Sequence, residues 1–195
     1  MQRSACELLE LIQNILDISR LEAGRSPLQL AAVSLDDLIA QIARETQPLW
    51  ERPGIEFGYR IDARLPIQHT DPIKLKIVLK NLIANAIKFT DRGRVSVDAE
   101  PDQGGVAITV TDTGVGIAPE DLGKIFEQFR QGKHGERRVD GLGLGLYIAR
   151  QLVELLGGTI SVDSEEGRGS SFRVWIPNRA DARGREEYTL SPPAA

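Results

Sequence analysis

Two carboxamides and two ammonium groups lie on one side of a predicted helix that spans residues 71–90. At about 100° per residue, one stripe of that helix collects Lys74, Asn81, Asn85 and Lys88. Asn costs roughly 0.5 kcal/mol relative to Ala in a helix, so two of them one turn apart call for a reason. Such a face suits an anionic, metal-bound ligand, although a solvated helix face would have the same composition.

A second candidate is an aspartate followed by two glycines, Asp112, Gly114 and Gly116, at the end of a predicted strand. Because glycine has no Cβ atom, the backbone beside the Asp112 carboxylate would be open to the approach of a flat ligand. An Asx-turn would show the same letters, so this stretch alone leaves both interpretations open.

Three alternating glycines, Gly141, Gly143 and Gly145, lead into a predicted helix that ends at Gly157. Backbone amides at a helix start are free to hold phosphate oxygens, aided by the positive end of the helix dipole. The spacing is neither that of a Walker loop nor that of the dinucleotide fingerprint.

The helix of residues 71–90 is predicted to position the first group, with Asp71 as its N-cap and Pro72 at its first position. Its expected core side is Leu75, Val78, Leu82, Ala86 and Phe89, with Leu79 at the edge. Further helices are predicted over residues 4–24, 35–50 and 119–125, and strands over residues 28–33, 55–61, 94–100, 106–112, 158–164 and 170–177. The apolar band of residues 4–24 is wider than a lone surface helix needs.

In this order and spacing, the segments resemble the ATP-binding domain of sensor histidine kinases, a Bergerat-type fold shared with gyrase. Residues 71–90 resemble the N box, residues 112–116 the first glycine box and residues 141–146 the second, where Leu142 replaces the usual Thr. Residues 126–129, FEQF, match the F box, and we expect its two Phe to be core anchors. Residues 130–140 look like the ATP lid, with Lys133, Arg137 and Arg138 as weaker candidates for phosphate contacts.

The resemblance implies roles for particular residues. Asn85 would ligate Mg²⁺, while Asn81 and Lys88 would address the phosphates during catalysis. Asp112 would accept a hydrogen bond from the adenine amino group, which favours ATP over GTP by roughly tenfold to over a hundredfold. The complete implied nucleotide site is Asn81, Asn85, Lys88, Phe89, Asp112, Gly114, Gly116, Ile117, Gly141, Leu142, Gly143, Leu144, Gly145, Leu146 and Ser170.

The implied fold is an α/β (α+β) two-layer sandwich, a mixed sheet with helices on one face, preceded by one long N-terminal helix. Residues 1–25 resemble the second helix of the dimerisation and phosphotransfer hairpin, residues 28–178 form the ATP-binding domain, and residues 179–195 are expected to be disordered. The hairpin's phospho-accepting His is expected on a helix that this sequence does not contain. The two histidines present, His69 and His134, lie elsewhere.

The composition of the chain limits the partners and the cellular location that we expect. The 195 residues carry a formal charge of −4 and no dense basic run, so nucleic acid is not expected as a partner. Cys6 is the single cysteine, which fits a reducing compartment. Neither a signal-peptide pattern nor an apolar run long enough to span a bilayer is present, so we expect a cytoplasmic location without membrane contact.

The predicted function is donation of the ATP γ-phosphate to a His, with a response-regulator receiver domain downstream and a homodimeric full-length kinase. A gyrase-type ATPase is the first alternative, disfavoured because Asn81 stands where those enzymes have a water-activating Glu, and an amide is no general base. A binding module that has lost the nucleotide is the second, disfavoured because Asn85, Asp112 and the glycine loops are intact.

Overall fold

The computed structural model describes residues 27–129 and 143–179. Five of the strands in these residues form a sheet in the order β2-β4-β5-β7-β6. Its members are β2 (Ile55–Ile61), β4 (Gly93–Asp102), β5 (Gly105–Asp112), β6 (Thr159–Glu165) and β7 (Gly169–Pro177). β2 runs parallel to β4, and every other neighbouring pair is antiparallel. The sheet is therefore mixed, as predicted.

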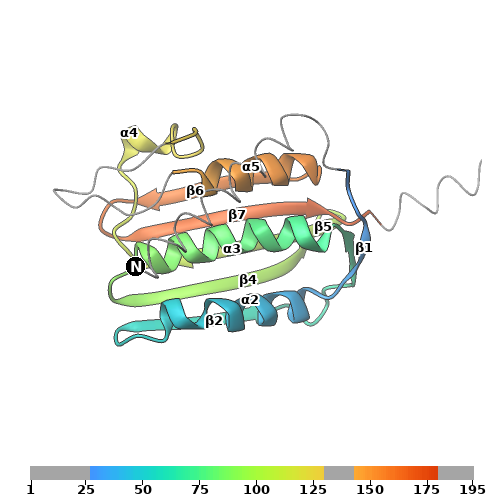
Figure 1. Cartoon of the computed structure of the whole chain (residues 1–195), viewed down its shortest axis with the longest axis horizontal. Coiled ribbons are helices and arrows are strands. Elements are labelled where there is room, and N and C mark those ends of the chain that lie inside the picture. The colour runs from blue at the N-terminus through green and yellow to red at the C-terminus, as the bar shows by residue number, and fades with distance from the viewer. Residues whose placement is uncertain (1–26, 130–142, 180–195) are drawn as a thin grey trace, which may run out of the picture.

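The long helices of the described chain, α2 (Leu35–Trp50), α3 (Pro72–Lys88) and α5 (Gly145–Leu155), lie on one face of this sheet, with α3 in the middle (Figure 1). Strand residues alternate accordingly: Phe172, Val174 and Ile176 of β7 are buried under the helices, whereas Arg173 and Trp175 point to the other face. This arrangement confirms the predicted two-layer sandwich.

The core side of α3 is broader than predicted. Leu79, expected at the edge, is fully buried, and so are Ile83 and Ile87, which the single-stripe prediction omitted. α2 and α5 flank α3 and the sheet lies beneath it, so this helix buries three sides. Phe89, expected in the core stripe, instead forms the C-cap and is partly exposed.

Helix boundaries follow their capping residues. The Ser34 hydroxyl accepts the N–H of Asp37 at 3.3 Å and starts α2, which spans the predicted residues. At its other end, Trp50 stacks on Phe57 of β2, with ring centroids 5.1 Å apart. The fourth helix, α4 (Pro119–Leu122), is shorter than the predicted 119–125.

A small second sheet joins both ends of the described domain. β1 (Ala31–Val33) pairs antiparallel with β3 (Gln68–Thr70), so that Ala32 faces His69. On the other edge of β3, the side chain of Asn178 accepts the His69 N–H at 3.0 Å and donates to the Ile67 carbonyl at 3.0 Å. The N–H of Arg179 donates to the His69 carbonyl at 3.2 Å. The domain's contacts thus reach Arg179, one residue past the expected boundary.

The strands agree with prediction apart from their lengths. β4 continues to Asp102 and β5 begins at Gly105. The two strands are therefore joined by a turn of two residues, Gln103 and Gly104, where the predicted strand ends left residues 101–105. The first predicted strand shortens to β1, and the connection before α3 contains the short strand β3. The predictions of an N-terminal helix, of an ATP lid and of a disordered tail, and the predicted site residues Gly141 and Leu142, fall outside the described residues, apart from Arg179.

Candidate functional site

The polar face of α3 is smaller than the sequence suggested. Asn81 and Asn85 are partly exposed and Lys88 is exposed, each on the C-terminal half of the helix. Lys74 does not belong with them, because its side chain is only 11% exposed and its Nζ lies 2.8 Å from the Asp71 carboxylate. The four-residue stripe was therefore wrong in one member: a long flexible stem lets Lys74 turn back toward Asp71.

Asn81 connects α3 to the glycine-rich start of α5. Its Nδ2 donates to the Ile77 carbonyl one turn earlier at 3.0 Å, which turns its Oδ1 toward Gly145. A Cβ added to Gly145 would stand 2.8 Å from that Oδ1. A side chain at the first residue of α5 would therefore displace the Asn81 carboxamide. Two segments that the sequence separates by some sixty residues thus form one surface.

Other members of the second glycine box contribute backbone more than side chains. Gly143 has a φ of +68°, a conformation that L side chains rarely adopt. Leu144 is 1% exposed and belongs to the core, and Leu146 packs partly buried against it. Leu144 can therefore offer a ligand only its main chain.

The loop after β5, residues 113–117, packs against the C-terminal end of α3. The N–H of Val115 donates to the Phe89 carbonyl at 3.2 Å, and a Cβ on Gly114 would stand 2.2 Å from the same oxygen. Gly116, with φ +68°, would place a Cβ 2.0 Å from the Glu165 carbonyl. These glycines let the loop approach other backbone and so hold it beside α3, while their expected role beside a flat ligand stays a prediction.

Asp112 sits at the base of this loop and is 5% exposed. Its Oδ1 accepts the Gly114 N–H at 2.8 Å, and it pairs with Ser170 across β5 and β7. Burial raises the pKa of the Asp112 carboxyl, and the backbone N–H groups of Gly114 and Ser170 oppose that rise. A buried carboxylate with so few donors is suited to accept a further hydrogen bond from a ligand.

Ser164 of β6 is a site residue that the sequence reasoning missed. Its hydroxyl accepts the N–H of Ile117 at 2.9 Å, donates to the Gly169 carbonyl at 2.8 Å and lies 2.9 Å from the Ser170 hydroxyl. It therefore fixes the end of the loop to the β6–β7 hairpin, and places Ser170 beside Asp112 as expected. The predicted hairpin already set Ser164 opposite Ser170, which was the available signal.

The two Phe residues of the F box lie in different environments. Phe126 is partly buried and packs against the core, with the Arg150 guanidinium 5.8 Å from its ring centre. Phe129 is 65% exposed, so its prediction as a core anchor was wrong. Phe126 is held by α5 beneath it, whereas Phe129 follows the turn residues after α4, beyond the reach of the core.

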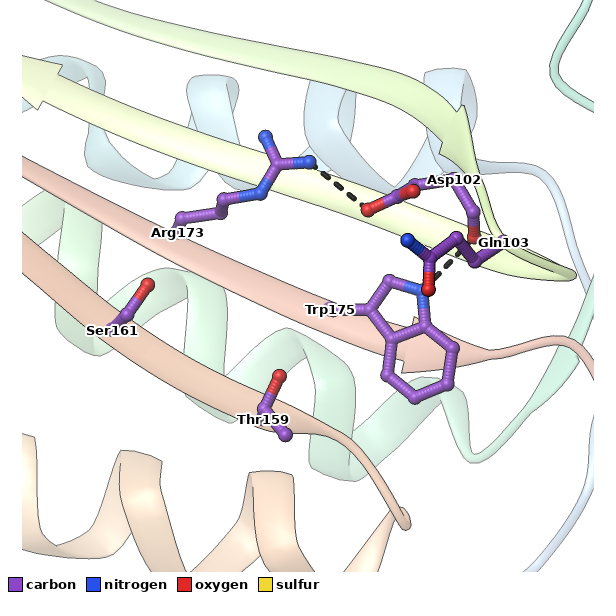
Figure 2. Close-up of a pocket in the computed structure, with 6 residues that line it drawn as sticks. All are labelled: Asp102, Gln103, Thr159, Ser161, Arg173 and Trp175. Atoms are coloured by element: carbon purple, nitrogen blue, oxygen red, sulfur yellow. Dashed lines mark hydrogen bonds and ion pairs between the residues drawn. The ribbon is translucent and has the colours of Figure 1, made fainter.

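A hollow of about 340 Å³ lies elsewhere, on the sheet face away from the helices (Figure 2). Arg173 in its wall is held by the carboxylates of Glu100 at 3.3 Å and Asp102 at 3.0 Å, and the Trp175 indole N–H donates to the Asp102 carbonyl. It holds none of the predicted site residues, and its cation is already neutralised. We therefore place the functional site on the helical face.

Within residues 27–129 and 143–179, no cluster of three or more His, Cys, Asp or Glu side chains could hold a metal ion. A cation at this site would need oxygen ligands of another kind. No helix in the same ranges is long and apolar enough to cross a membrane.

The fold and the site define a known class of ATPase. The model of the family described as histidine kinase-, DNA gyrase B-, and HSP90-like ATPase matches residues 70–180, and this chain belongs to that family. That range contains α3, the loop after β5 and the start of α5, which together form the candidate site.

Within the family, the proteins similar to this chain include sensor histidine kinases. It is 38% identical over 176 residues to the circadian input-output histidine kinase CikA of Synechococcus elongatus, covering 88% of this chain and 23% of CikA. Full-length ShkA in complex with AMPPNP superposes with a TM-score of 0.81 at 36% identity, over 90% of this chain and 36% of ShkA. The nucleotide-free catalytic domain of the histidine kinase ThkA gives 0.68 at 28% identity, over 77% of this chain and 96% of that domain. The chain therefore spans less than a quarter of the curated relative.

Proposed function

We propose that this chain binds Mg·ATP between the C-terminal half of α3, the loop after β5 and the start of α5. It then donates the γ-phosphate to a histidine on a hairpin helix outside the described residues. The contact between Asn81 and Gly145 supports this most directly, because it brings an amide-bearing helix face against a glycine-rich helix start. Phosphate oxygens bound there would meet backbone N–H groups and the positive end of α5.

Each residue has a proposed role in this site. Asp112 accepts the adenine amino group, and Lys88 and Asn81 hold the phosphates. Asn85 offers Mg²⁺ a neutral amide oxygen, which fits a hard cation that takes its remaining ligands from phosphate and water. When bound, Mg²⁺ supplies charge neutralisation at the phosphates.

Asn81 favours transfer to protein over hydrolysis. Its carboxamide has no basic site to remove a proton from water, and its Nδ2 is already engaged by the Ile77 carbonyl. In the proposed transfer, the bond between the γ-phosphorus and the β,γ-bridging oxygen breaks as an imidazole nitrogen bonds to phosphorus. ADP leaves with the electron pair and the imidazole proton passes to solvent. The chain's contribution is positioning and electrostatic stabilisation.

The proposed partners follow from this role. They are ATP, the phospho-accepting hairpin helix of the same kinase and the receiver domain of a response regulator. The full-length kinase is proposed to be a homodimer, because the hairpin that residues 1–25 resemble is a dimerisation element. Nucleic acid and membrane contact have no part in the proposal.

Calorimetric titration with ATP, with and without Mg²⁺, tests the proposal. The unaltered chain should bind ATP more tightly with Mg²⁺, and Asn85→Ala should remove that difference because the variant loses the metal's amide ligand. Lys80→Ala is the control, since Lys80 lies on α3 in a partly exposed ion pair with Glu45 and should keep the Mg²⁺ effect.

The alternatives give different results. A chain that binds no ATP under either condition would be the degenerate binding module. A chain that binds ATP and releases inorganic phosphate with turnover, without any His acceptor, would be the gyrase-type ATPase. Equal Mg²⁺ dependence in Asn85→Ala and in the unaltered protein would remove Asn85 from the metal site.

A further inference from the structure

The two oxygens of the Asp71 carboxylate bind two different segments. Oδ1 accepts the N–H groups of Ile73 and Lys74, each at 3.1 Å, and so caps the start of α3. Oδ2 accepts the N–H of Gln29 at 2.9 Å and the Nζ of Lys74 at 2.8 Å. One side chain therefore both starts α3 and holds the chain that leads into the domain.

Lys74 completes the attachment. Its Nζ also donates to the Pro27 carbonyl at 3.0 Å, so residues 27 and 29 are both bound to the first turn of α3. The Asp71 side chain is 1% exposed and that of Lys74 is 11% exposed. Burial tends to raise the pKa of Asp71, but hydrogen bonds from Lys74 and Gln29 outweigh it and hold the pKa below its ordinary value. Breaking such a pair is costly because the remaining charge stays buried.

This attachment lies on the same helix as the proposed phosphate ligands. Asn81 is ten residues beyond Asp71 along α3, roughly 15 Å at 1.5 Å per residue. A packed helix moves as a rigid body, so the position of residues 27–29 relative to α3 also sets their position relative to Asn81 and Asn85. Any segment before Pro27 joins the domain at this point.

We infer that Asp71 and Lys74 are positioning residues that fix the ATP-binding face of α3 relative to the chain preceding Pro27. The inference rests on the proposed function, in which residues 1–25 belong to the hairpin whose other helix supplies the acceptor His. The pair touches neither nucleotide nor acceptor. Its effect falls on phosphoryl transfer and not on ATP binding.

Asp71→Asn separates the two roles of the carboxylate. The Asn side chain keeps Oδ1 as a helix cap, but it presents Nδ2, a donor, to the Gln29 N–H and the Lys74 ammonium. In the 195-residue chain we expect the Gln29 amide to exchange at least about tenfold faster by NMR. The ATP dissociation constant should stay within about twofold, because Asn81, Asn85 and Asp112 are unchanged. In a longer kinase carrying the His-bearing helix, transfer to that His should slow by at least about tenfold.

Variants of Lys74 provide the second measurement. Lys74→Met should repeat the loss of transfer, and Lys74→Arg should restore most of it by supplying a cation to Asp71. Lys76→Met is the matched control, because Lys76 pairs with Glu45 at the surface and should leave transfer unchanged. Thermal unfolding of each variant establishes that the domain is folded at the assay temperature.

Each outcome is decisive. Unchanged transfer in Asp71→Asn despite fast Gln29 exchange overturns the inference, and so does a loss of ATP affinity that matches the loss of transfer. Protected Gln29 in Asp71→Asn overturns it as well, because the attachment would then not depend on the carboxylate. Absence of ATP binding and transfer in the unaltered kinase overturns the proposed function and the inference with it.

Discussion

The Oδ1 of Asn81 lies against Gly145, so closely that a Cβ on Gly145 would stand 2.8 Å from it. Gly145 is the first residue of α5 and has no left-handed backbone, so its lack of a side chain serves this contact and not a turn. Phe89, two turns beyond Asn81 on α3, makes the corresponding contact with the loop after β5 through its carbonyl. α3 is thereby bound on two sides to the segments that are proposed to enclose the nucleotide.

Gly145→Ala should weaken ATP binding by about tenfold or more, because the added methyl displaces the Asn81 carboxamide. Its unfolding free energy should change by less than about 1 kcal/mol, since Ala gains helix propensity while Asn81 shifts. Gly123→Ala is the control: a Cβ there meets nothing within 4 Å and the backbone is right-handed helical. Calorimetry and urea unfolding measure both quantities. Normal ATP affinity in folded Gly145→Ala would show that binding does not need Asn81 in this position.

Asp112→Asn should lose ATP affinity and keep or gain stability at neutral pH. Asn can still accept the Gly114 N–H through Oδ1 but then offers the adenine amino group a donor, which costs roughly tenfold to over a hundredfold in affinity. Burial raises the pKa of Asp112 in the folded state. Its favourable contribution to stability is therefore complete below the unfolded value, about 3.9, and is lost as the pH rises through the folded value.

The Asp112→Asn variant has no carboxyl group to titrate at this position, so it does not show this loss of stability with rising pH. Urea unfolding at about pH 7 and about pH 4 should therefore find the variant at least as stable as the unaltered protein at the higher pH, with its relative advantage falling at the lower pH. A variant that is less stable at neutral pH and more stable in acid would contradict the assignment of the raised pKa to Asp112.

Arg52→Met should destabilise the domain by about 1–3 kcal/mol. The Nη2 of Arg52 donates to the carbonyls of Ile87 and Thr90, each at 3.1 Å, and so satisfies acceptors that the end of α3 leaves open. Arg60→Met is the matched control, because Arg60 is 85% exposed in a pair with Asp98 and should change stability by no more than about 0.5 kcal/mol. Urea midpoints distinguish the two, and equal effects would refute the role of Arg52.

The 195-residue chain should bind ATP without labelling itself. His69 lies in β3 beside the start of α3, roughly 21 Å along the helix from Asn85, and its Nδ1 is buried. An acceptor nitrogen must come within about 3–3.5 Å of the phosphorus. Incubation with γ-labelled ATP measures this, and His134→Ala is included because His134 lies outside the described residues. Stoichiometric acid-labile label on the chain would show that the acceptor histidine is one of these two.

Local sequence signals predicted the elements, because caps and periodicity act within a few residues. Ser34 and Asp71 fixed the starts of α2 and α3, and alternation fixed β2 to within its observed bounds. The errors concern contacts between distant segments. Helical periodicity gives the direction of Lys74 but not the carbonyl of Pro27 that holds it, and it cannot show that α2 and α5 bury Ile83.

The residues of the candidate site were easier to predict than the contacts that hold them in place. Asp112, Ser170 and the loop glycines do lie together, yet Gly114 and Gly116 are needed because carbonyls of Phe89 and Glu165 approach them. Those contacts cross from one element to another and leave no local pattern. Ser164 is a partial case: its hairpin partners Gly169 and Ser170 in β7 were within reach of the sequence, whereas its bond to Ile117 in the loop after β5 was not.

The side chain of Asn178 forms hydrogen bonds along one edge of β3 that a neighbouring strand would otherwise form, while β1 pairs with the opposite edge. The described domain consequently receives and releases its chain at one end, with α4 at the far end (Figure 1). Polypeptide attached at either side would therefore extend from this end, away from α4 (Figure 1). The domain can therefore be attached to neighbouring segments through a single end, as a module.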